Sequence, residues 1–171
     1  MITLVPFENA DIPLFLSWFD GTDAAFLIQF GGQKLFYPLT ENQIISLLAD
    51  PALLCFKARD PVSGETVGHC QLMRIDTTKH TAAVGRVLIA PAHRGHGLGT
   101  ALMRSLIDHA KNVVHLKELS LNVFEFNTAA YTCYRNIGFI ETGWKEQYYD
   151  LIGQTWKAIS MKLDLPHYQE G

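Results

Sequence analysis

The chain has 171 residues, of which 48% are hydrophobic, so it can bury a substantial core as one domain and is too short for two ordinary ones. We expect a single domain over residues 1–171. The formal net charge of −3 comes without any block of basic residues, which argues against a nucleic-acid partner.

The cysteine pattern and the apolar runs indicate the cell compartment of the protein. Cys55, Cys70 and Cys133 are odd in number, widely spaced and set among apolar residues, which suits reduced core thiols better than a disulfide framework. No apolar run is long enough to span a bilayer, and residues 1–5 lack the basic start and long apolar middle of a signal peptide. We therefore expect a cytoplasmic protein without a membrane partner.

The first fifty residues read as a strand and two helices. Ile2–Val5 is β-prone, and Asp11–Phe19 gathers its apolar residues on one helical face. Thr40, with Gln43 three residues later, resembles a capping box that opens a helix running to about Leu48. Between the helices lies an aromatic segment around a glycine pair, which we expect to be irregular and to form either plain core or the wall of a substrate pocket: Phe26, Phe30, Gly31, Gly32, Phe36 and Tyr37.

The middle of the chain predicts a hairpin followed by a third strand. Leu53–Ala58 and Thr66–Met73 are apolar and β-prone, and the residues from Asp60 to Gly64 between them suit a turn. The third run, Ala82–Ile89, is stopped by Pro91.

The remaining elements complete an α/β (α+β) pattern. The spacing predicts, in order, a helix from Leu98 to Ala110, a strand Glu118–Val123, a helix Asn127–Ile137, and a closing strand pair, Phe139–Trp144 and Trp156–Met161, around Gly153. The expected fold is a mixed sheet flanked by helices.

The turn before the Leu98 helix is the first place where chemistry is expected. It reads Ala-His-Arg-Gly-His-Gly-Leu-Gly-Thr over residues 92–100. A helix N-terminus offers unpaired N–H groups and a partial positive charge, so anions bind there. Glycines allow a diphosphate to approach the backbone, and Arg94 can add a charge-assisted hydrogen bond. The alternative is a merely tight turn; the Walker and dinucleotide patterns are both absent.

Two blocks of the sequence resemble one known family. Arg94-Gly-His-Gly-Leu-Gly99, after a strand that ends Val-Leu-Ile-Ala-Pro91, is similar to the coenzyme A signature of the GNAT superfamily of N-acetyltransferases, Arg/Gln-x-x-Gly-x-Gly/Ala. The second block of that family appears as Asn127-x-x-Ala130-x-x-x-Tyr134-x-x-x-Gly-Phe. The resemblance covers about residues 53–163 and implies a mostly antiparallel, twisted central sheet, splayed to admit coenzyme A.

The resemblance also implies a set of residues that bind acetyl-CoA, the expected co-substrate. The diphosphate would lie on the amides of the glycine turn, pantetheine would pair like an extra strand with Val87 and Ile89, and Asn127 would bind the pantetheine arm or cap its own helix. The whole set is Val87, Leu88, Ile89, Arg94, Gly95, His96, Gly97, Leu98, Gly99, Thr100, Asn127, Ala130 and Tyr134.

The implied reaction is acetyl transfer from the thioester to an amine. A phenol near the sulfur can stabilise or protonate the leaving thiolate, and by resemblance Tyr134 has this catalytic role. A buried helix aromatic is the structural alternative for Tyr134. Free alkylamines are protonated at neutral pH, so a base, a water relay or a neutral substrate is required.

The sequence departs from part of the family in its catalytic base, because in those members an acidic residue often lies on the strand before the turn. That strand reads Ala-Ala-Val-Gly-Arg over residues 82–86 and has no carboxylate. Glu125 or Asp76 through water, or His69, are the candidates. Of the remaining histidines, His93 and His96 border the glycine turn, and the others show no metal-ligand spacing, so we expect no metal: His80, His109, His115 and His167.

Two readings from other classes stay open beside the enzyme. One is a catalytically inactive acyl-CoA-binding regulatory module, and the other is a nucleotide-binding protein that uses the same turn. The acceptor can be a polyamine, an amino acid, an aminoglycoside, a protein N-terminus or another amine. We expect a monomer or a homodimer.

Overall fold

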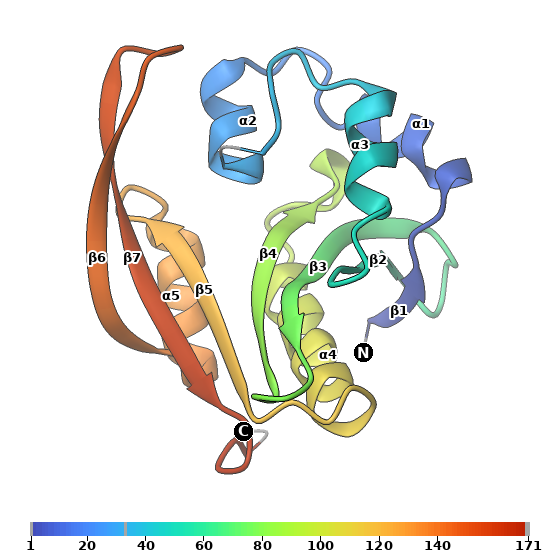
Figure 1. Ribbon diagram of the computed structural model, residues 1–171. Helices are drawn as coiled ribbons and strands as arrows, with labels where there is room; N and C mark the ends of the chain where they lie inside the picture. Colours follow the sequence, from blue (N-terminus) through green and yellow to red (C-terminus); the bar gives the residue numbers. More distant parts are fainter. Residues whose placement is uncertain (1, 33, 170–171) are drawn as a thin grey trace.

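The computed structural model describes residues 2–32 and 34–169, so the extreme ends of the expected domain, at residues 1, 170 and 171, lie outside the described residues (Figure 1). Along these residues the elements are β1 Thr3–Pro6, a 3-10 turn Asn9–Asp11, α1 Ile12–Ser17, α2 Ala24–Gly31, α3 Glu41–Leu48, β2 Leu54–Arg59, β3 Thr66–Asp76, β4 Thr81–Ile89, a 3-10 turn Pro91–His93, α4 Leu98–Asn112, β5 Glu118–Phe124, α5 Thr128–Ile137, β6 Ile140–Tyr149 and β7 Gln154–Asp164.

One mixed sheet organises the described residues. Its seven strands follow the order β1-β2-β3-β4-β5-β7-β6, and each pair is antiparallel except β4 with β5. That pair is parallel because α4 carries the chain back across the sheet between the two strands. The mixed, mostly antiparallel sheet expected from the sequence is confirmed.

The sheet opens between β4 and β5. The two strands pair only from Thr81 to Ala83, opposite Glu118 to Ser120, whereas β5 pairs with β7 along its whole length. Figure 1 shows β4 and β5 running apart toward the end of the sheet where α2 lies. Within the described residues, the second half of β4 therefore has no strand partner on its β5 side, and the expected splay is present.

Helices cover both faces of the sheet, and each face has its own core. The larger core joins α4 and α5 to the sheet: Leu102, Leu106 and Ile107 of α4 are fully buried at helical spacing, against Leu119 and Met161. The smaller core lies under α1 to α3, where Phe15 is buried with Leu88 of β4 and with Ala90, which directly follows that strand. Both cores thus hold β4 in place on either side of the opening.

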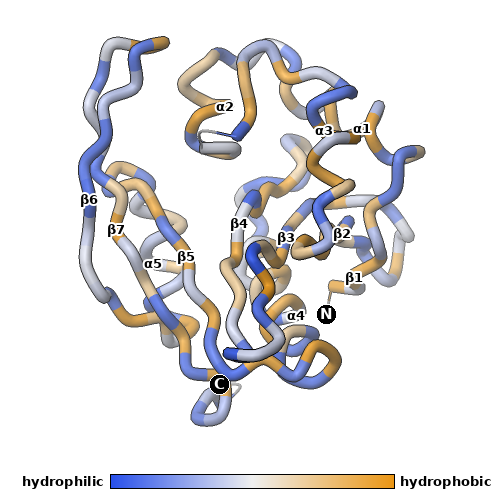
Figure 2. The backbone as a smooth tube through the Cα atoms, viewed as in Figure 1, coloured by the Kyte–Doolittle hydropathy of each residue, from blue (hydrophilic) through white to orange (hydrophobic). Residues whose placement is uncertain are grey.

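The prediction that the aromatic segment is irregular is wrong for its first half. Residues 24–31 form α2, which is hydrophobic along most of its length (Figure 2). Asp23 starts this helix by accepting a hydrogen bond from the amide of Phe26 at 2.9 Å, and Gly32 ends it with a φ of 62°. Phe30 packs on the smaller core, whereas Phe36 is 70% exposed. The N-cap aspartate was the missed signal.

The capping box predicted from Thr40 and Gln43 is also wrong. Helix α3 begins at Glu41 as expected, but the Thr40 side chain makes no capping hydrogen bond. The side-chain amide of Gln43 instead accepts from the Phe36 amide at 2.7 Å and donates to the carbonyls of Phe36 and Pro38. Gln43 therefore ties the loop after α2 to α3.

The remaining boundaries differ modestly from the sequence-based ones. The first helix is shorter than predicted, ending at Ser17, and the last two strands are longer, because β6 reaches Tyr149 and β7 begins at Gln154. Strand β6 is an edge strand, largely exposed, so the apolar alternation that marks a half-buried strand is missing from it. No described helix is both long enough and apolar enough to cross a membrane.

Candidate active site

The glycine-rich turn has a row of free amide donors. Helix α4 begins at Leu98, with Gly97 as its N-cap in a left-handed conformation, φ 74°. The first amide of this turn to find a backbone acceptor is that of Ala101, so the N–H groups of residues 95–100 donate to no acceptor within residues 2–32 and 34–169. A Cβ atom added at Gly95, Gly97 or Gly99 would meet nothing within 4 Å. The turn is therefore an open cradle that fits an anion.

Arg94 is held beside this cradle. Its Nε donates to the carbonyl of Ile89 at 3.0 Å, and its guanidinium lies 5.7 Å from the ring centre of Phe26 on α2. These contacts orient the arginine, and the side chain stays exposed to solvent at the mouth of the opening.

The β4 edge leads from the cradle into the opening. A register shift in the β3–β4 ladder, opposite residues 69–71, makes a bulge at Arg86, whose φ is 50°. After the bulge, Val87 and Ile89 pack toward the larger core and Leu88 toward the smaller one. The unpaired backbone of this edge can accept an extended, amide-bearing ligand as a further strand.

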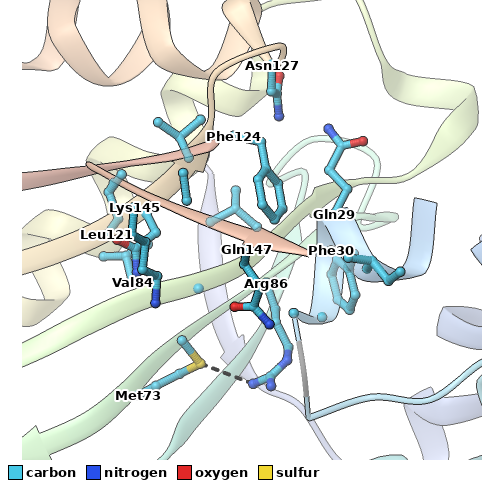
Figure 3. A pocket seen from close by; sticks show the side chains of 18 of the residues that line it. Gln29, Phe30, Met73, Val84, Arg86, Leu121, Phe124, Asn127, Lys145 and Gln147 are labelled. Atoms are coloured by element: carbon cyan, nitrogen blue, oxygen red, sulfur yellow. Dashed lines mark hydrogen bonds between the residues drawn. The ribbon is translucent and has the colours of Figure 1, made fainter. Parts of the chain in front are cut away.

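A cavity of about 270 Å³ occupies the opening between β4 and β5. It is closed by α2 on one side and by β6 and β7 on the other, and in Figure 3 Arg86 and Asn127 lie on opposite sides of it. The structure brings three sequence-predicted residues to this cavity, namely Val87, Asn127 and Tyr134. The residues of the glycine turn lie beyond the end of β4 and do not line the cavity.

Tyr134 reaches the cavity from α5. Its ring packs against Phe139, 6.0 Å between centroids, and its hydroxyl has no hydrogen-bond partner in the described part of the chain. Burial raises the pKa of Tyr134 to about 12, so the phenol keeps its proton at neutral pH. A protonated phenol with a free hydroxyl can donate to a ligand atom in the cavity.

The other two residues of the second motif have structural positions. The Asn127 side chain caps α5 by accepting from the Ala130 amide at 3.3 Å, which confirms the capping alternative and leaves its amide NH₂ free of this bond. Ala130 packs on the larger core. Nearby, Cys133 lies 3.2 Å from the Thr100 hydroxyl, so α5 is tied to the first turn of α4.

None of the three candidate bases lines the cavity. Glu125 pairs with Lys157 at 3.0 Å, and Asp76 accepts from the amides of the turn that follows β3. His69 is fully buried beneath phenylalanine rings. Burial lowers the pKa of His69 to about 4, so its imidazole is neutral at pH 7.

Arg86 is a residue of the cavity that no sequence motif indicated. Its side chain is only 9% exposed, yet it lines the cavity; its Nη1 donates to Gln71 Oε1 at 2.8 Å and contacts Met73 Sδ at 3.1 Å (Figure 3). Its backbone carbonyl lies 2.9 Å from Nδ1 of His69. A single charge inside a strand that otherwise carries none was the available signal, but a guanidinium is not a candidate base and was therefore passed over.

A second cavity adjoins the first. Its volume is about 830 Å³, and it shares with the first cavity the lining residues Gly31, Met73, Arg74, Arg86 and Asn122. Among the residues that the structure describes, no group of three or more His, Cys, Asp or Glu side chains is placed to hold a metal ion. The arrangement offers an anion cradle after the end of β4, an open β4 edge, and a phenol at the cavity beside that edge.

Comparison with known proteins places this arrangement in context. The model of the acetyltransferase (GNAT) family matches residues 17–139. The N-alpha-acetyltransferase RimI of Mycobacterium tuberculosis is 33% identical over 102 residues, which is 59% of this chain and 61% of that protein. The spermidine N(1)-acetyltransferase of Vibrio cholerae is 30% identical over 77 residues, 45% of this chain and 44% of that protein. The matched stretches thus span less than two thirds of either relative.

The fold is similar to that of solved structures over nearly the whole chain. A crystal structure of spermidine N-acetyltransferase from Vibrio cholerae in complex with CoA and spermine superposes with a TM-score of 0.83 at 20% identity. The superposition covers 98% of this chain and 97% of that one. At this identity the likeness shows a shared fold.

Proposed function

The chain belongs to the acetyltransferase (GNAT) family, and we propose that it transfers the acetyl group of acetyl-CoA to a primary amine. One observation carries the proposal: the anion cradle at residues 95–100 follows the end of β4, the unpaired β4 edge leads from there to the cavity, and Tyr134 lines that cavity. The first two suit the diphosphate and the amide-bearing arm of coenzyme A, and the third suits its sulfur.

The proposed reaction changes one bond and one proton at the amine and at the sulfur, and Tyr134 assists at the sulfur. The amine nitrogen forms a bond to the acetyl carbon, the carbon–sulfur bond breaks, the nitrogen loses one proton and the thiolate gains one. The pKa of Tyr134, about 12, lies above that of a thiol, so Tyr134 stabilises the developing negative charge by donating a hydrogen bond while retaining its own proton. The proton lost by the amine then balances the one that the sulfur takes up.

Among the described residues that line the cavity there is no aspartate, glutamate or histidine, and this bears on how the amine is deprotonated. With Glu125, Asp76 and His69 outside it, we propose that the amine loses its ammonium proton to water before attack. Neutralising an alkylamine at pH 7 costs roughly 4 to 5 kcal/mol, and a desolvating pocket lowers that cost. The rate of acetylation is then expected to rise with pH through the neutral range.

The test is amine-dependent release of free thiol. The full chain is incubated with acetyl-CoA and a panel of amino acids, peptides, polyamines and aminoglycosides, and both thiol and acetylated product are measured. We expect both products in equal amounts with at least one class of amine. Acetyl-CoA binding without thiol release for any amine would favour the inactive regulatory module, and stabilisation by ATP in place of acetyl-CoA would favour the nucleotide-binding alternative.

A further inference from the structure

The two adjoining cavities are positively charged although the chain as a whole is negative. Arg74, Arg86 and Lys145 line the smaller cavity, and no aspartate or glutamate among the described residues does so. The larger cavity adds Lys34 and one carboxylate, Asp50. Four cations thus face one anion in a protein of net charge −3. A site with this balance attracts acidic ligands and repels cationic ones.

Arg86 lines both cavities, and it is buried without an anionic partner among the described residues. No described aspartate or glutamate lies within ion-pair distance of it. Its Nε is buried and has no hydrogen-bond partner within residues 2–32 and 34–169, although Nη1 is bound to Gln71. Desolvation lowers the pKa of the Arg86 guanidinium, as expected of an uncompensated cation. Burying such a charge is costly unless a ligand pairs with it.

The phosphates of coenzyme A are not the expected partner for Arg86. The anion cradle lies beyond the far end of β4, at residues 95–100, with its own arginine, Arg94. Between the cradle and Arg86 run the residues of β4 where the uncharged pantetheine arm is proposed to lie. The anion that Arg86 is placed to bind therefore enters with the acceptor.

We propose that the acceptor is an amine whose molecule also carries a carboxylate, as in a free amino acid or an acidic peptide. This inference rests on the proposed acetyl transfer and narrows its substrate class. Arg86 binds the carboxylate at the junction of the two cavities, and Arg74 and Lys145 add to the positive potential. Polyamines, which carry several positive charges, are poor acceptors in this pocket.

Matched acceptors test the role of the carboxylate. Thiol release and product mass are measured for leucine and glutamate, for leucinamide, for the C-terminal amide of a dipeptide beginning with glutamate and for spermidine. We expect the acids to be used at least about tenfold more efficiently than leucinamide or spermidine, the range of one charged hydrogen bond. The dipeptide separates the two sources, because efficient use of it over free glutamate would assign the acid to a peptide side chain.

Variants test the role of the arginine. Arg86→Met keeps much of the volume and removes the charge, and it is expected to raise the Michaelis constant for the acid about tenfold while leaving that for acetyl-CoA nearly unchanged. Arg86→Lys is expected to recover part of the loss. Arg74→Gln, at an exposed position, is expected to give a smaller rise and a folded protein. Lys79→Gln is the control, since Lys79 is 77% exposed and lines neither cavity.

The outcomes separate the inference from the function it rests on. Thiol release with spermidine or leucinamide as efficient as with the acids would keep the acetyltransferase and overturn the carboxylate preference, as would an Arg86→Met protein with an unchanged constant for the acid. If no amine of the panel releases thiol, the thermal shift of the CoA-loaded protein is measured with each amine. Stabilisation by the acids alone supports the inference without the reaction. Equal stabilisation by all amines, or none by any, contradicts it.

Discussion

Nδ1 of His69 lies 2.9 Å from the backbone carbonyl oxygen of Arg86, across the β3–β4 ladder at the point where β4 bulges. A carbonyl only accepts, so the neutral imidazole carries its proton on Nδ1 and donates it to Arg86. Nε2 of the same ring lies 3.0 Å from Cys55 Sγ, and the thiol can donate to it, because burial raises the pKa of Cys55 to about 12. The histidine fixes the bulge that orients Arg86.

Stability is predicted to fall with acidification because of His69. Its pKa is about 4 in the folded protein and 6.5 in the unfolded chain, so between these values the unfolded state binds more protons. The contribution is fully present above pH 6.5, is lost as pH falls toward 4, and amounts to roughly 3 kcal/mol over the whole window. Urea unfolding at a series of pH values measures it.

The matched variant for this prediction is His69→Gln, whose side-chain amide can still donate to Arg86 but does not titrate. The difference in unfolding free energy between wild type and variant is expected to change with pH in that window and to stay constant above it. A constant difference from pH 4 to pH 7 would contradict the assigned neutral state of His69.

Binding of acetyl-CoA is predicted to require glycine at position 99. Because Cβ atoms on a helix tilt toward its N-terminus, a valine there projects toward the cradle at residues 95–97. Gly99→Val is expected to weaken acetyl-CoA binding by more than about tenfold, by blocking the backbone, with the fold retained because a Cβ atom added there meets nothing within 4 Å. Gly97→Val is a poorer test, since the φ of 74° at Gly97 strains any β-branched residue.

Titration calorimetry measures that affinity, and Gly143→Val on β6 is the matched control. Gly143 also has open space around an added Cβ atom and lies away from the turn. Equal acetyl-CoA affinities of the two valine variants would contradict binding of the diphosphate at the glycine turn.

The contribution of Arg94 is predicted to depend on salt. Arg94→Ala removes an exposed charge next to the anion cradle, so acetyl-CoA binding is expected to weaken several-fold at low ionic strength. The loss should shrink as ionic strength rises from about 0.05 M to about 0.5 M, because salt screens exposed charges. A loss independent of salt would mean that Arg94 acts by packing on Phe26 and binding the Ile89 carbonyl.

Local patterns predicted most of the fold. Helix α4 was found because its apolar residues recur at helical spacing, and β3 and β4 because they are long and apolar. Helix α2 was missed because its aromatic residues and the Gly31-Gly32 pair outweighed the N-cap at Asp23. Strand β6 was cut short because an exposed edge strand has no apolar face to mark it.

The candidate site could be predicted only where it depends on the backbone. Glycine spacing at residues 94–99 and the motif that contains Tyr134 carry that information in the sequence itself. The position of Arg86 depends on a bulge between strands and on cavities formed by α2, β3 and β6, which are contacts between distant segments. The same reason explains why Glu125 and Asp76 looked suitable as bases although both lie outside the cavity.

The chemical step of the proposed function depends on the hydroxyl of Tyr134. Tyr134→Phe keeps the ring that packs on Phe139 and removes only the hydroxyl, so folding and acetyl-CoA affinity should be retained. The hydrogen bond to sulfur strengthens only as the thiolate forms, so the loss is expected in kcat and not in the Michaelis constant for acetyl-CoA. Tyr131→Phe is a matched control on α5, since the Tyr131 hydroxyl donates to Glu141 and does not line the cavity.

The most direct test is the single-turnover rate of acetyl transfer by wild type, Tyr134→Phe and Tyr131→Phe, measured with saturating acetyl-CoA and the best amine of the panel. Tyr134→Phe is expected to slow this rate on the order of 10²-fold, whereas Tyr131→Phe is expected to leave it nearly unchanged. A Tyr134→Phe protein that transfers acetyl at the wild-type rate would contradict a role of the hydroxyl at the leaving sulfur and would mean that Tyr134 acts by packing alone.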